Sequence, residues 1–268
     1  MLSIGGLALT GCADGLRPGA RGVFEIFAPP SPAEAVEMAT NRYDPDERYR
    51  GTQLLSTATF ASEPVYVSLF RDNASDQDPG VRAASIRALG LHGAQSDTPL
   101  LIERLKDEDP TVRAEAARAL QRIHSPEAVV PLLERLSNKT EDEAQVRVEA
   151  ASALGQFAQP RVVEALIAAL GDEQLAVNAS VQTSLRTLTG QDFGLDQSAW
   201  QTWYKASPSL FDARAAYIYP VFYRDRNWWE YFPFVSPPPN EQPAMPVGVN
   251  PSDIAAEPGR SNDPGRAK

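Results

Sequence analysis

Few side chains of this 268-residue chain have the types and spacing that catalysis or metal binding needs. The chain has two histidines, His92 and His124, and a single cysteine, Cys12. Neither histidine belongs to a known motif with a serine or cysteine nucleophile, and neither has a second ligand at a metal-binding spacing. A single cysteine cannot form a disulfide within the chain. The sequence therefore predicts no catalytic residue, no metal site and no cofactor.

Acidic residues cluster at 106–109 and at 141–143, where two neighbouring carboxylates could act as general acid and base. Both clusters directly precede segments that we expect to be helical. Negative charge is favourable at the start of a helix because of the helix dipole. We therefore expect both clusters to be solvated residues at helix starts, with no catalytic role.

A repeated segment occupies the middle of the chain and must position any functional residue. Val81, Val112, Val146 and Val177 follow one another at intervals of 31, 34 and 31 residues. After each valine, apolar or small residues recur at i+4, i+7, i+8 and i+11, with His92 as the one exception, and these offsets form one stripe of an α-helix. The Asp-Pro pairs at 78–79 and 109–110 suit a helix N-cap followed by the first helical residue.

Between these helices lie apolar segments that begin at residues 98, 125 and 159, so each repeat is expected to contain two helices. Weaker versions of the pattern occur at 32–57 and 63–71. We therefore predict an all-α fold, an α-solenoid of about five helix pairs, with residues 31–190 as the repeat array.

The pattern DPxVRxxAxxAL resembles the HEAT-like repeats of phycobilin lyases and of many scaffold proteins. The resemblance covers roughly residues 60 to 190 and is specific for the fold but weak for function. It implies that acid–arginine pairs form a structural ladder along the stack. The implied pairs are Asp78 with Arg82, Asp109 with Arg113, and Asp142 or Glu143 with Arg147.

The N-terminal sequence MLSIGGLALTGC resembles the lipobox of bacterial lipoproteins. The resemblance implies that diacylglycerol is attached to the sulfur of Cys12 and that residues 1–12 are a signal segment, followed by a linker at 13–30. We expect a lipid-anchored protein of the cell envelope. No stretch reaches the roughly 18 apolar residues of a spanning helix, so the membrane contact is the anchor alone. The alternative is a chance Leu-Thr-Gly-Cys in a cytoplasmic protein.

The formal net charge of -10 argues against nucleic acid as a partner, because phosphate binding needs clustered Lys and Arg. Three arginines stand out on this acidic background. Arg87, Arg118 and Arg122 lie on helices expected to line the inner face of the solenoid. They are candidates for a modest basic strip that binds a partner.

All four tryptophans lie within residues 200–229. Asp196 is expected to cap a short helix whose Trp200, Trp203 and Tyr204 close the last repeat, within an extension over 191–235. Beyond it, an aromatic arm either folds back over the array or presents side chains to a partner. The candidate binding residues in this arm are Trp228, Trp229, Tyr231 and Phe232. Residues 236–268 are rich in proline and predict a disordered tail.

Together these features favour a non-enzymatic scaffold that binds an unknown protein partner at the cell envelope. One alternative is an envelope glycan-binding module that uses the aromatic arm, since exposed aromatic faces can stack on sugar rings. Another is a ligand-handling protein like the phycobilin lyases, which rests only on the shared repeats.

Overall fold

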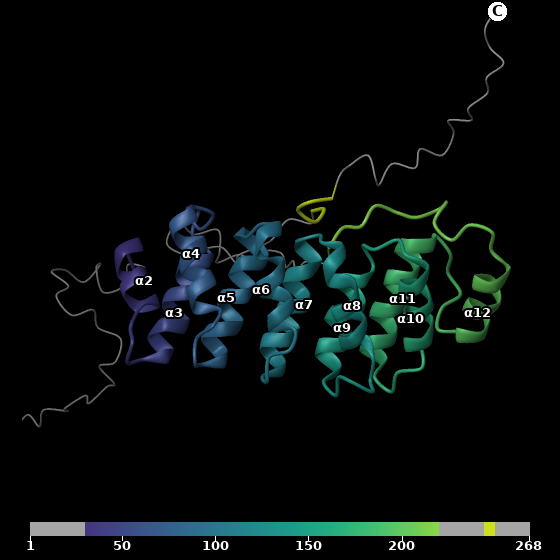
Figure 1. Cartoon of the computed structure of the whole chain (residues 1–268), viewed down its shortest axis with the longest axis horizontal. Helices are drawn as coiled ribbons and strands as arrows, with labels where there is room; N and C mark the ends of the chain where they lie inside the picture. The colour runs from purple at the N-terminus through teal and green to yellow at the C-terminus, as the bar shows by residue number, and fades with distance from the viewer. Residues whose placement is uncertain (1–29, 220–243, 250–268) are drawn as a thin grey trace, which may run out of the picture.

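The computed structural model describes residues 30–219 and 244–249. Within these ranges the chain is a row of α-helices with two short 3-10 turns and no β-strand (Figure 1). The prediction of an all-α solenoid is therefore confirmed. The elements are α2 (Pro32–Ala39), α3 (Pro45–Ser56), α4 (Pro64–Asn73), α5 (Pro79–His92), η1 (Gln95–Asp97), α6 (Thr98–Arg104), α7 (Pro110–Arg122), η2 (Pro126–Ala128), α8 (Val129–Leu136), α9 (Ala144–Leu154), α10 (Pro160–Ala169), α11 (Leu175–Thr189) and α12 (Gln197–Ala206).

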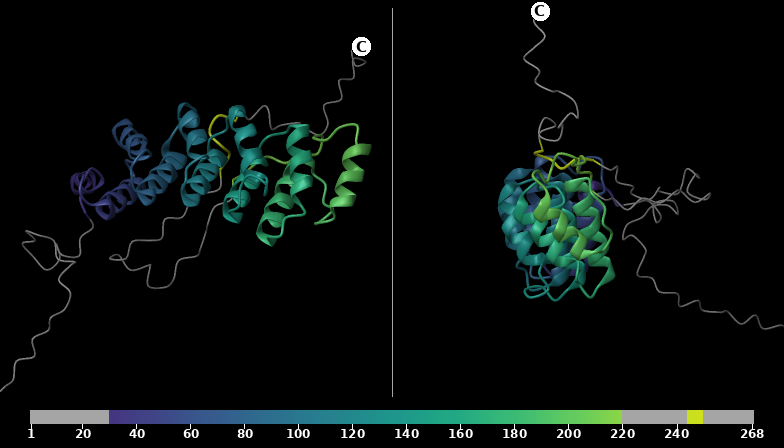
Figure 2. Two further views of the ribbon diagram at one scale, coloured as in Figure 1. Left: turned by 60° about the horizontal axis from the view of Figure 1, so that its bottom comes forward. Right: turned by 90° about the vertical axis from the view of Figure 1, so that its right-hand side faces the viewer.

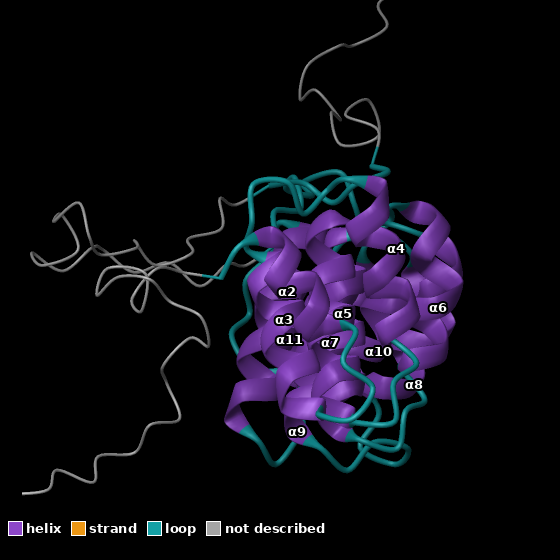
Figure 3. Cartoon of the chain, turned by 90° about the vertical axis from the view of Figure 1, so that its left-hand side faces the viewer, coloured by secondary structure: helices purple, strands orange, loops and turns teal. Residues whose placement is uncertain are grey.

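The helices pair in chain order, from α2 with α3 to α10 with α11, which gives five pairs. The second helix of each pair also packs against the second helix of the next pair. We call α3, α5, α7, α9 and α11 the inner layer. Figure 3 looks along the row and shows α4, α6, α8 and α10 on the opposite side from α3, α9 and α11. Figure 2 shows the row running from α2 to α12.

The helix starts follow from the Asp-Pro pairs. Asp78 accepts a hydrogen bond from the backbone N–H of Val81 at 3.0 Å, and Asp109 accepts from the N–H groups of Thr111 and Val112 at 2.8 and 3.3 Å. These bonds satisfy donors that have no partner inside the helix. The proline that follows each aspartate lacks an N–H, so nothing is lost at the first helical position.

The core consists of apolar columns that repeat along the inner layer. The valines that mark the repeats are fully buried, and so are the leucines eight residues after each of them. The buried columns are Val81, Val112, Val146 and Val177, and Leu89, Leu120, Leu154 and Leu185. Small residues let the helices approach closely, because a Cβ on Gly90 of α5 would lie 2.9 Å from the Cα of Ala119 in α7.

The last repeat is covered by α12, which packs against α10. Trp200 is fully buried and lies edge-on against Phe193 and Trp203, with ring centroids 5.0 and 6.0 Å apart. Its indole N–H donates to the carbonyl oxygen of Gly194 at 3.0 Å, so its only polar group is satisfied. No helix of the described part of the chain is long and apolar enough to cross a bilayer.

Candidate interaction surface

A ladder of arginine–carboxylate pairs links consecutive repeats. In each rung, an arginine near the start of an inner-layer helix reaches an acid in the loop before the next inner-layer helix. The rungs are Arg48–Asp76, Arg82–Asp107, Arg113–Glu141 and Arg147–Asp172. Arg82 is typical: it donates to both carboxylate oxygens of Asp107 at 2.7 and 2.9 Å. It also donates to the carbonyl oxygens of Asp76 and Gln77, at 2.9 and 3.0 Å.

The acids in these rungs differ from those expected. We expected Arg82 to pair with Asp78 and Arg113 to pair with Asp109. Asp78 and Asp109 instead cap their own helices, and Arg147, which we expected to pair with Asp142 or Glu143, pairs with Asp172. The acid that pairs with Arg82 is Asp107, two residues before Asp109, whose backbone N–H it accepts at 3.0 Å.

The expectation that the acidic clusters are solvated is wrong for two of their members. The side chains of Asp107 and Glu141 are only 4% and 1% exposed. Burial alone would raise the pKa of the Asp107 carboxyl, but the guanidinium of Arg82 and the N–H of Asp109 bond to the charged form and hold the pKa below its ordinary value. The same balance, with Arg113 as the cation, lowers the pKa of Glu141. These carboxylates are therefore ionised parts of the fold.

The ladder ends in the last inner-layer helix. Asn178 of α11 occupies the place of the arginine, and its side-chain amide donates to the carbonyl oxygen of Asp172 at 2.9 Å. This bond replaces one of the loop contacts that an arginine makes, but asparagine carries no charge for a further rung. The fifth repeat is thus the last that the ladder joins.

Two of the three arginines proposed as a basic strip meet on the exposed face of the inner layer. Arg87 of α5 and Arg118 of α7 both donate to the same oxygen of Glu115, at 2.5 and 2.9 Å. Arg118 also bonds Glu149 of α9. The two glutamate side chains are only 4% and 10% exposed, whereas those of Arg87 and Arg118 are 50% and 31% exposed. We call these four residues the Arg–Glu row.

The Arg–Glu row corrects the picture of a basic strip. Each exposed guanidinium is neutralised by a carboxylate beneath it, so the row is an ion-pair network across three repeats. Glu149 is held further by the side-chain amides of Gln121 and Gln145, at 2.8 and 2.7 Å. The pairs of Glu115 with Arg87 and of Glu149 with Arg118 could not be read from the sequence, because the paired residues lie 28 and 31 positions apart in the chain.

Arg122, the third arginine, is buried and lies under the returning chain. Its guanidinium carbon is 5.2 Å from the centre of the Tyr219 ring, and Arg122 is 9% exposed. Such a cation–π contact stabilises a desolvated guanidinium. Arg122 thus supports the C-terminal segment and is not part of the exposed row.

Residues after α12 turn back along the row towards the middle repeats (Figures 1 and 2). The N–H of Ala215 donates to the carbonyl oxygen of Thr187 in α11, at 2.8 Å. The hydroxyl of Tyr217 donates to the carbonyl oxygen of Ser152 in α9, at 2.5 Å. Burial raises the pKa of the Tyr217 phenol, and the charge of Glu149 adds to the effect. Of the two paths considered for the arm, its first part therefore folds back. Cys12 and the candidates Trp228, Trp229, Tyr231 and Phe232 lie outside the described residues.

Both histidines have structural partners. His92 lies 2.7 Å from the carbonyl oxygen of Ser56 through Nε2 and 3.1 Å from the hydroxyl of Ser62 through Nδ1. His124 lies 2.9 Å from the side-chain oxygen of Gln156 through Nδ1. Among the described residues, no three His, Cys, Asp or Glu side chains are placed to hold a metal ion.

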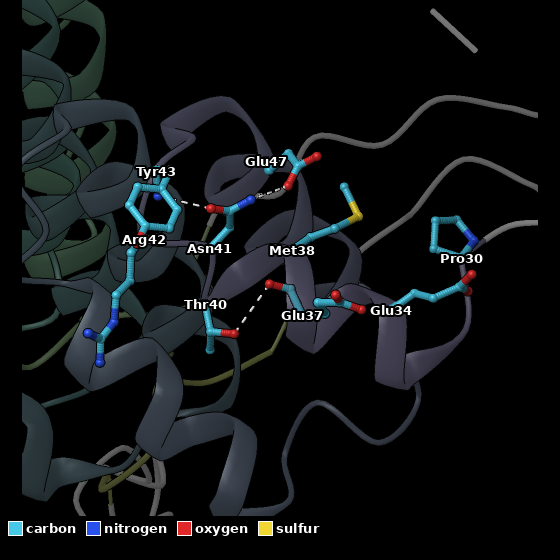
Figure 4. A pocket seen from close by; sticks show the side chains of 9 residues that line it. All are labelled: Pro30, Glu34, Glu37, Met38, Thr40, Asn41, Arg42, Tyr43 and Glu47. Atoms are coloured by element: carbon cyan, nitrogen blue, oxygen red, sulfur yellow. Dashed lines mark hydrogen bonds between the residues drawn. The ribbon is translucent and has the colours of Figure 1, made fainter. Parts of the chain in front are cut away.

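A depression of about 550 Å³ lies on the first helix pair (Figure 4). Its lining includes Glu34, Glu37 and Glu47, with Arg42 and Asn41 beside them. The amide of Asn41 donates to Glu47 at 2.5 Å and so fixes the turn between α2 and α3. Among the residues that line it, no acid and base pair is in hydrogen-bond contact.

Two family models match the array. The model described as HEAT repeats matches residues 67–145, and the model described as PBS lyase HEAT-like repeat matches residues 146–172. Residues 67–172 of the array therefore match HEAT repeats. The resemblance drawn from the DPxVRxxAxxAL pattern is therefore confirmed for the repeats. No curated protein sequence matches the chain.

Solved structures share the fold at low identity. YibA from Escherichia coli is 20% identical over 69% of each chain, with a TM-score of 0.47. The complex of CpcE and CpcF of phycocyanin lyase, from a Nostoc species, is 21% identical over 57% of this chain and 99% of that chain, with a TM-score of 0.45. Human deoxyhypusine hydroxylase is 20% identical over 60% of this chain and 74% of that chain, with a TM-score of 0.39.

These structures correct one expectation. We predicted that the chain is not an enzyme, because it has no recognisable catalytic motif. The solved structures similar to it include a phycocyanin lyase and a deoxyhypusine hydroxylase, which are enzymes. The prediction that the chain is not an enzyme is therefore wrong. The structural similarity shows the fold alone and assigns no reaction to this chain.

Proposed function

We propose that this protein is an interaction scaffold that binds a partner protein along the exposed face of the inner layer. The observation that carries the proposal is the Arg–Glu row, which crosses α5, α7 and α9 on the face that the outer helices leave open. HEAT arrays offer such long surfaces because each repeat adds one more helix to the same face.

The row is suited to a protein partner because it is rigid and already neutralised. The buried carboxylates of Glu115 and Glu149 hold Arg87 and Arg118 in place, so less side-chain entropy is lost on binding. Arginine is enriched at protein interfaces, where its planar guanidinium forms several hydrogen bonds at once. A phosphate backbone, in contrast, would need cations without carboxylate partners.

A crosslinking experiment tests this surface. Thr183 of α11 follows Arg87, Arg118 and Ser152 at the repeat intervals of 31, 34 and 31 residues, and it is exposed. A photoreactive residue at Thr183 should crosslink a defined partner in cells. The matched control is Glu164, which is exposed on α10 in the outer layer and should give no such product.

The row itself is tested by Arg87→Ala. This variant leaves Glu115 paired with Arg118, so the fold should be retained. We expect the crosslink from Thr183 to fall at least fivefold, since arginine is enriched among the hot-spot residues whose truncation costs more than about 1 kcal/mol. The control is Arg161→Ala, because Arg161 is exposed on α10 in the outer layer, and it should leave the amount of crosslinked product unchanged. Equal crosslinking from Thr183 and Glu164, or no effect of Arg87→Ala, contradicts the proposal.

We also propose that the scaffold is held at the bacterial cell envelope by a lipid on Cys12. The support is the sequence Leu-Ala-Leu-Thr-Gly-Cys at residues 7–12. Mass spectrometry of the protein from the membrane fraction should find Cys12 as a diacylglyceryl N-terminal residue. An unmodified Cys12 thiol in a soluble protein would overturn the anchor and leave the interaction surface untouched.

A further inference from the structure

Residues 244–249 lie against the end of α7, and residues 246–249 form a turn in which the N–H of Val249 donates to the carbonyl oxygen of Pro246 at 3.4 Å. The N–H of Val247 donates to the carbonyl oxygen of Arg122 at 2.7 Å, and the N–H of His124 donates to the carbonyl oxygen of Val247 at 2.8 Å. Ile123 and Val247 thus form an isolated parallel bridge. A helix end and this segment pair here through main-chain atoms, as in strand-addition complexes.

Side chains next to this bridge select the residues of the segment. Pro246 is buried and borders a small cavity with Tyr217 and Gly155. Gly248 has a φ of 92°, in the left-handed region that favours glycine, and a Cβ there would overlap the side chain of Gln95. Gln95 is held in turn, because its amide donates to the carbonyl oxygen of His124 at 2.8 Å. These contacts therefore favour a Pro-x-Gly sequence in a turn.

A second cavity, of about 240 Å³, begins where the segment ends. Gly248 and Val249 form part of its wall, together with His124, Gln156 and Arg214. Within residues 30–219 and 244–249, the guanidinium of Arg214 forms no ion pair. A carboxylate a few residues after the glycine of a bound peptide could pair with Arg214 in this space.

We propose that this groove, formed by Gln95, Ile123, His124, Tyr217 and Arg214, is a binding site for a peptide of a partner protein that turns at a Pro-x-Gly core. Residues 244–249 occupy it as an internal ligand. The partner peptide carries an apolar Pro-x-Gly core followed by an acidic residue. The groove lies at the ends of the inner helices, apart from the Arg–Glu row, so this proposal does not depend on the proposed function.

The internal ligand is suited to displacement. Two main-chain hydrogen bonds to the array and one from the N–H of Tyr219 to the carbonyl oxygen of Ala244 hold it, and its residues Met245 and Val247 are 42% and 54% exposed. Covalent attachment gives such a segment an effective concentration on the order of millimolar, so it competes with a free peptide without binding tightly. A free peptide with the same core followed by an acidic residue can therefore compete for the groove.

The test uses the full chain with Gly248→Val, because a β-branched residue strains the positive φ as well as meeting Gln95. The probe is a fluorescein-labelled peptide with the sequence of residues 243–253, which includes Asp253. By fluorescence anisotropy, the variant should bind the probe at least tenfold more tightly than the wild type. Gly171→Val is the matched control and should behave as wild type, since a Cβ there meets nothing within 4 Å.

Two further measurements make the result specific. The same peptide with valine in place of its glycine should bind the Gly248→Val protein at least tenfold more weakly. Amide hydrogen exchange at His124 should be faster in that protein than in wild type, and the native peptide should slow it again.

Several results would overturn the proposal. It fails if the Gly248→Val protein does not bind the native peptide, if it binds both peptides equally, or if the wild type binds as tightly as the variant. A wild-type dimer that becomes a monomer on Gly248→Val substitution would also refute it, because the occupant would then be the segment of a second copy.

Discussion

Removal of one ladder arginine tests how strongly the rungs hold consecutive repeats together. Arg82→Ala deletes the two bonds to Asp107 and the two bonds to loop carbonyls. The Asp107 carboxylate, 4% exposed, keeps only Arg104 as a neighbouring cation, at 3.5 Å. Loss of one partner of a buried pair costs about 3–5 kcal/mol, because the other charge remains buried. Since Arg104 offsets part of this cost, we expect a loss of about 3 kcal/mol.

The control is an ion pair of the same chemistry that is exposed to solvent. Arg186 and Asp192 lie 3.3 Å apart, with side chains 58% and 49% exposed. Exposed pairs contribute about 0–1 kcal/mol, so Arg186→Ala should be nearly neutral. The double variant Arg82→Met with Asp107→Leu removes both charges of the rung and should recover stability to within about 1 kcal/mol of wild type.

The assay is urea unfolding followed by circular dichroism. Repeat arrays can unfold in parts, so hydrogen exchange of α5 and α7 should accompany it. The reasoning is refuted if Arg82→Ala costs no more than Arg186→Ala, or if the double variant is as unstable as Arg82→Ala. Either result would mean that the Arg82–Asp107 ion pair does not stabilise the contact between the two repeats.

Three further predictions concern the stack. The pKa values of Asp107 and Glu141 are held below 3.8 and 4.5, so their stabilisation is present above these values and is lost as the pH falls through the lowered pKa. As the pH is lowered, the free energy of unfolding should therefore fall more steeply in wild type than in the double variant Arg82→Met with Asp107→Leu. Gly51→Ala should cost about 1–3 kcal/mol by pushing α2 from α3, while Gly171→Ala should be neutral in the same urea assay. Trp200→Ala should cost about 3–5 kcal/mol and speed hydrogen exchange in α12.

The repeat architecture could be predicted because it depends on local patterns. The valine intervals set the register of the array, and Asp-Pro marked where α5 and α7 begin. The weak pattern at 32–57 and 63–71 still located the first helices, because burial of one face requires the same spacing in every repeat.

The acids of the ladder were missed because their partners belong to another repeat. Their signal was nevertheless present: Asp76, Asp107, Glu141 and Asp172 follow one another at 31, 34 and 31 residues, the intervals of the valines. We had assigned ladder pairs within one repeat, whereas the stack brings together residues that lie 25 to 28 positions apart.

The path of residues 244–249 could not be inferred from sequence. Their contacts are main-chain hydrogen bonds at a helix end, and such bonds leave no pattern of side chains. The Arg–Glu row was hidden for a different reason, since Glu115 and Glu149 each stand among the alanines of a core-like sequence. Their burial depends on arginines of neighbouring helices.

The ladder also determines where a further repeat could be added to the array. Every rung reaches from an arginine to an acid of the following repeat, so all internal junctions are equivalent. A copied unit of 31 residues, inserted in phase between α7 and α8, would bring its own arginine and its own acid and would complete both new junctions. At the C-terminal end Asn178 interrupts this series. A longer version built from that end would first need an arginine there.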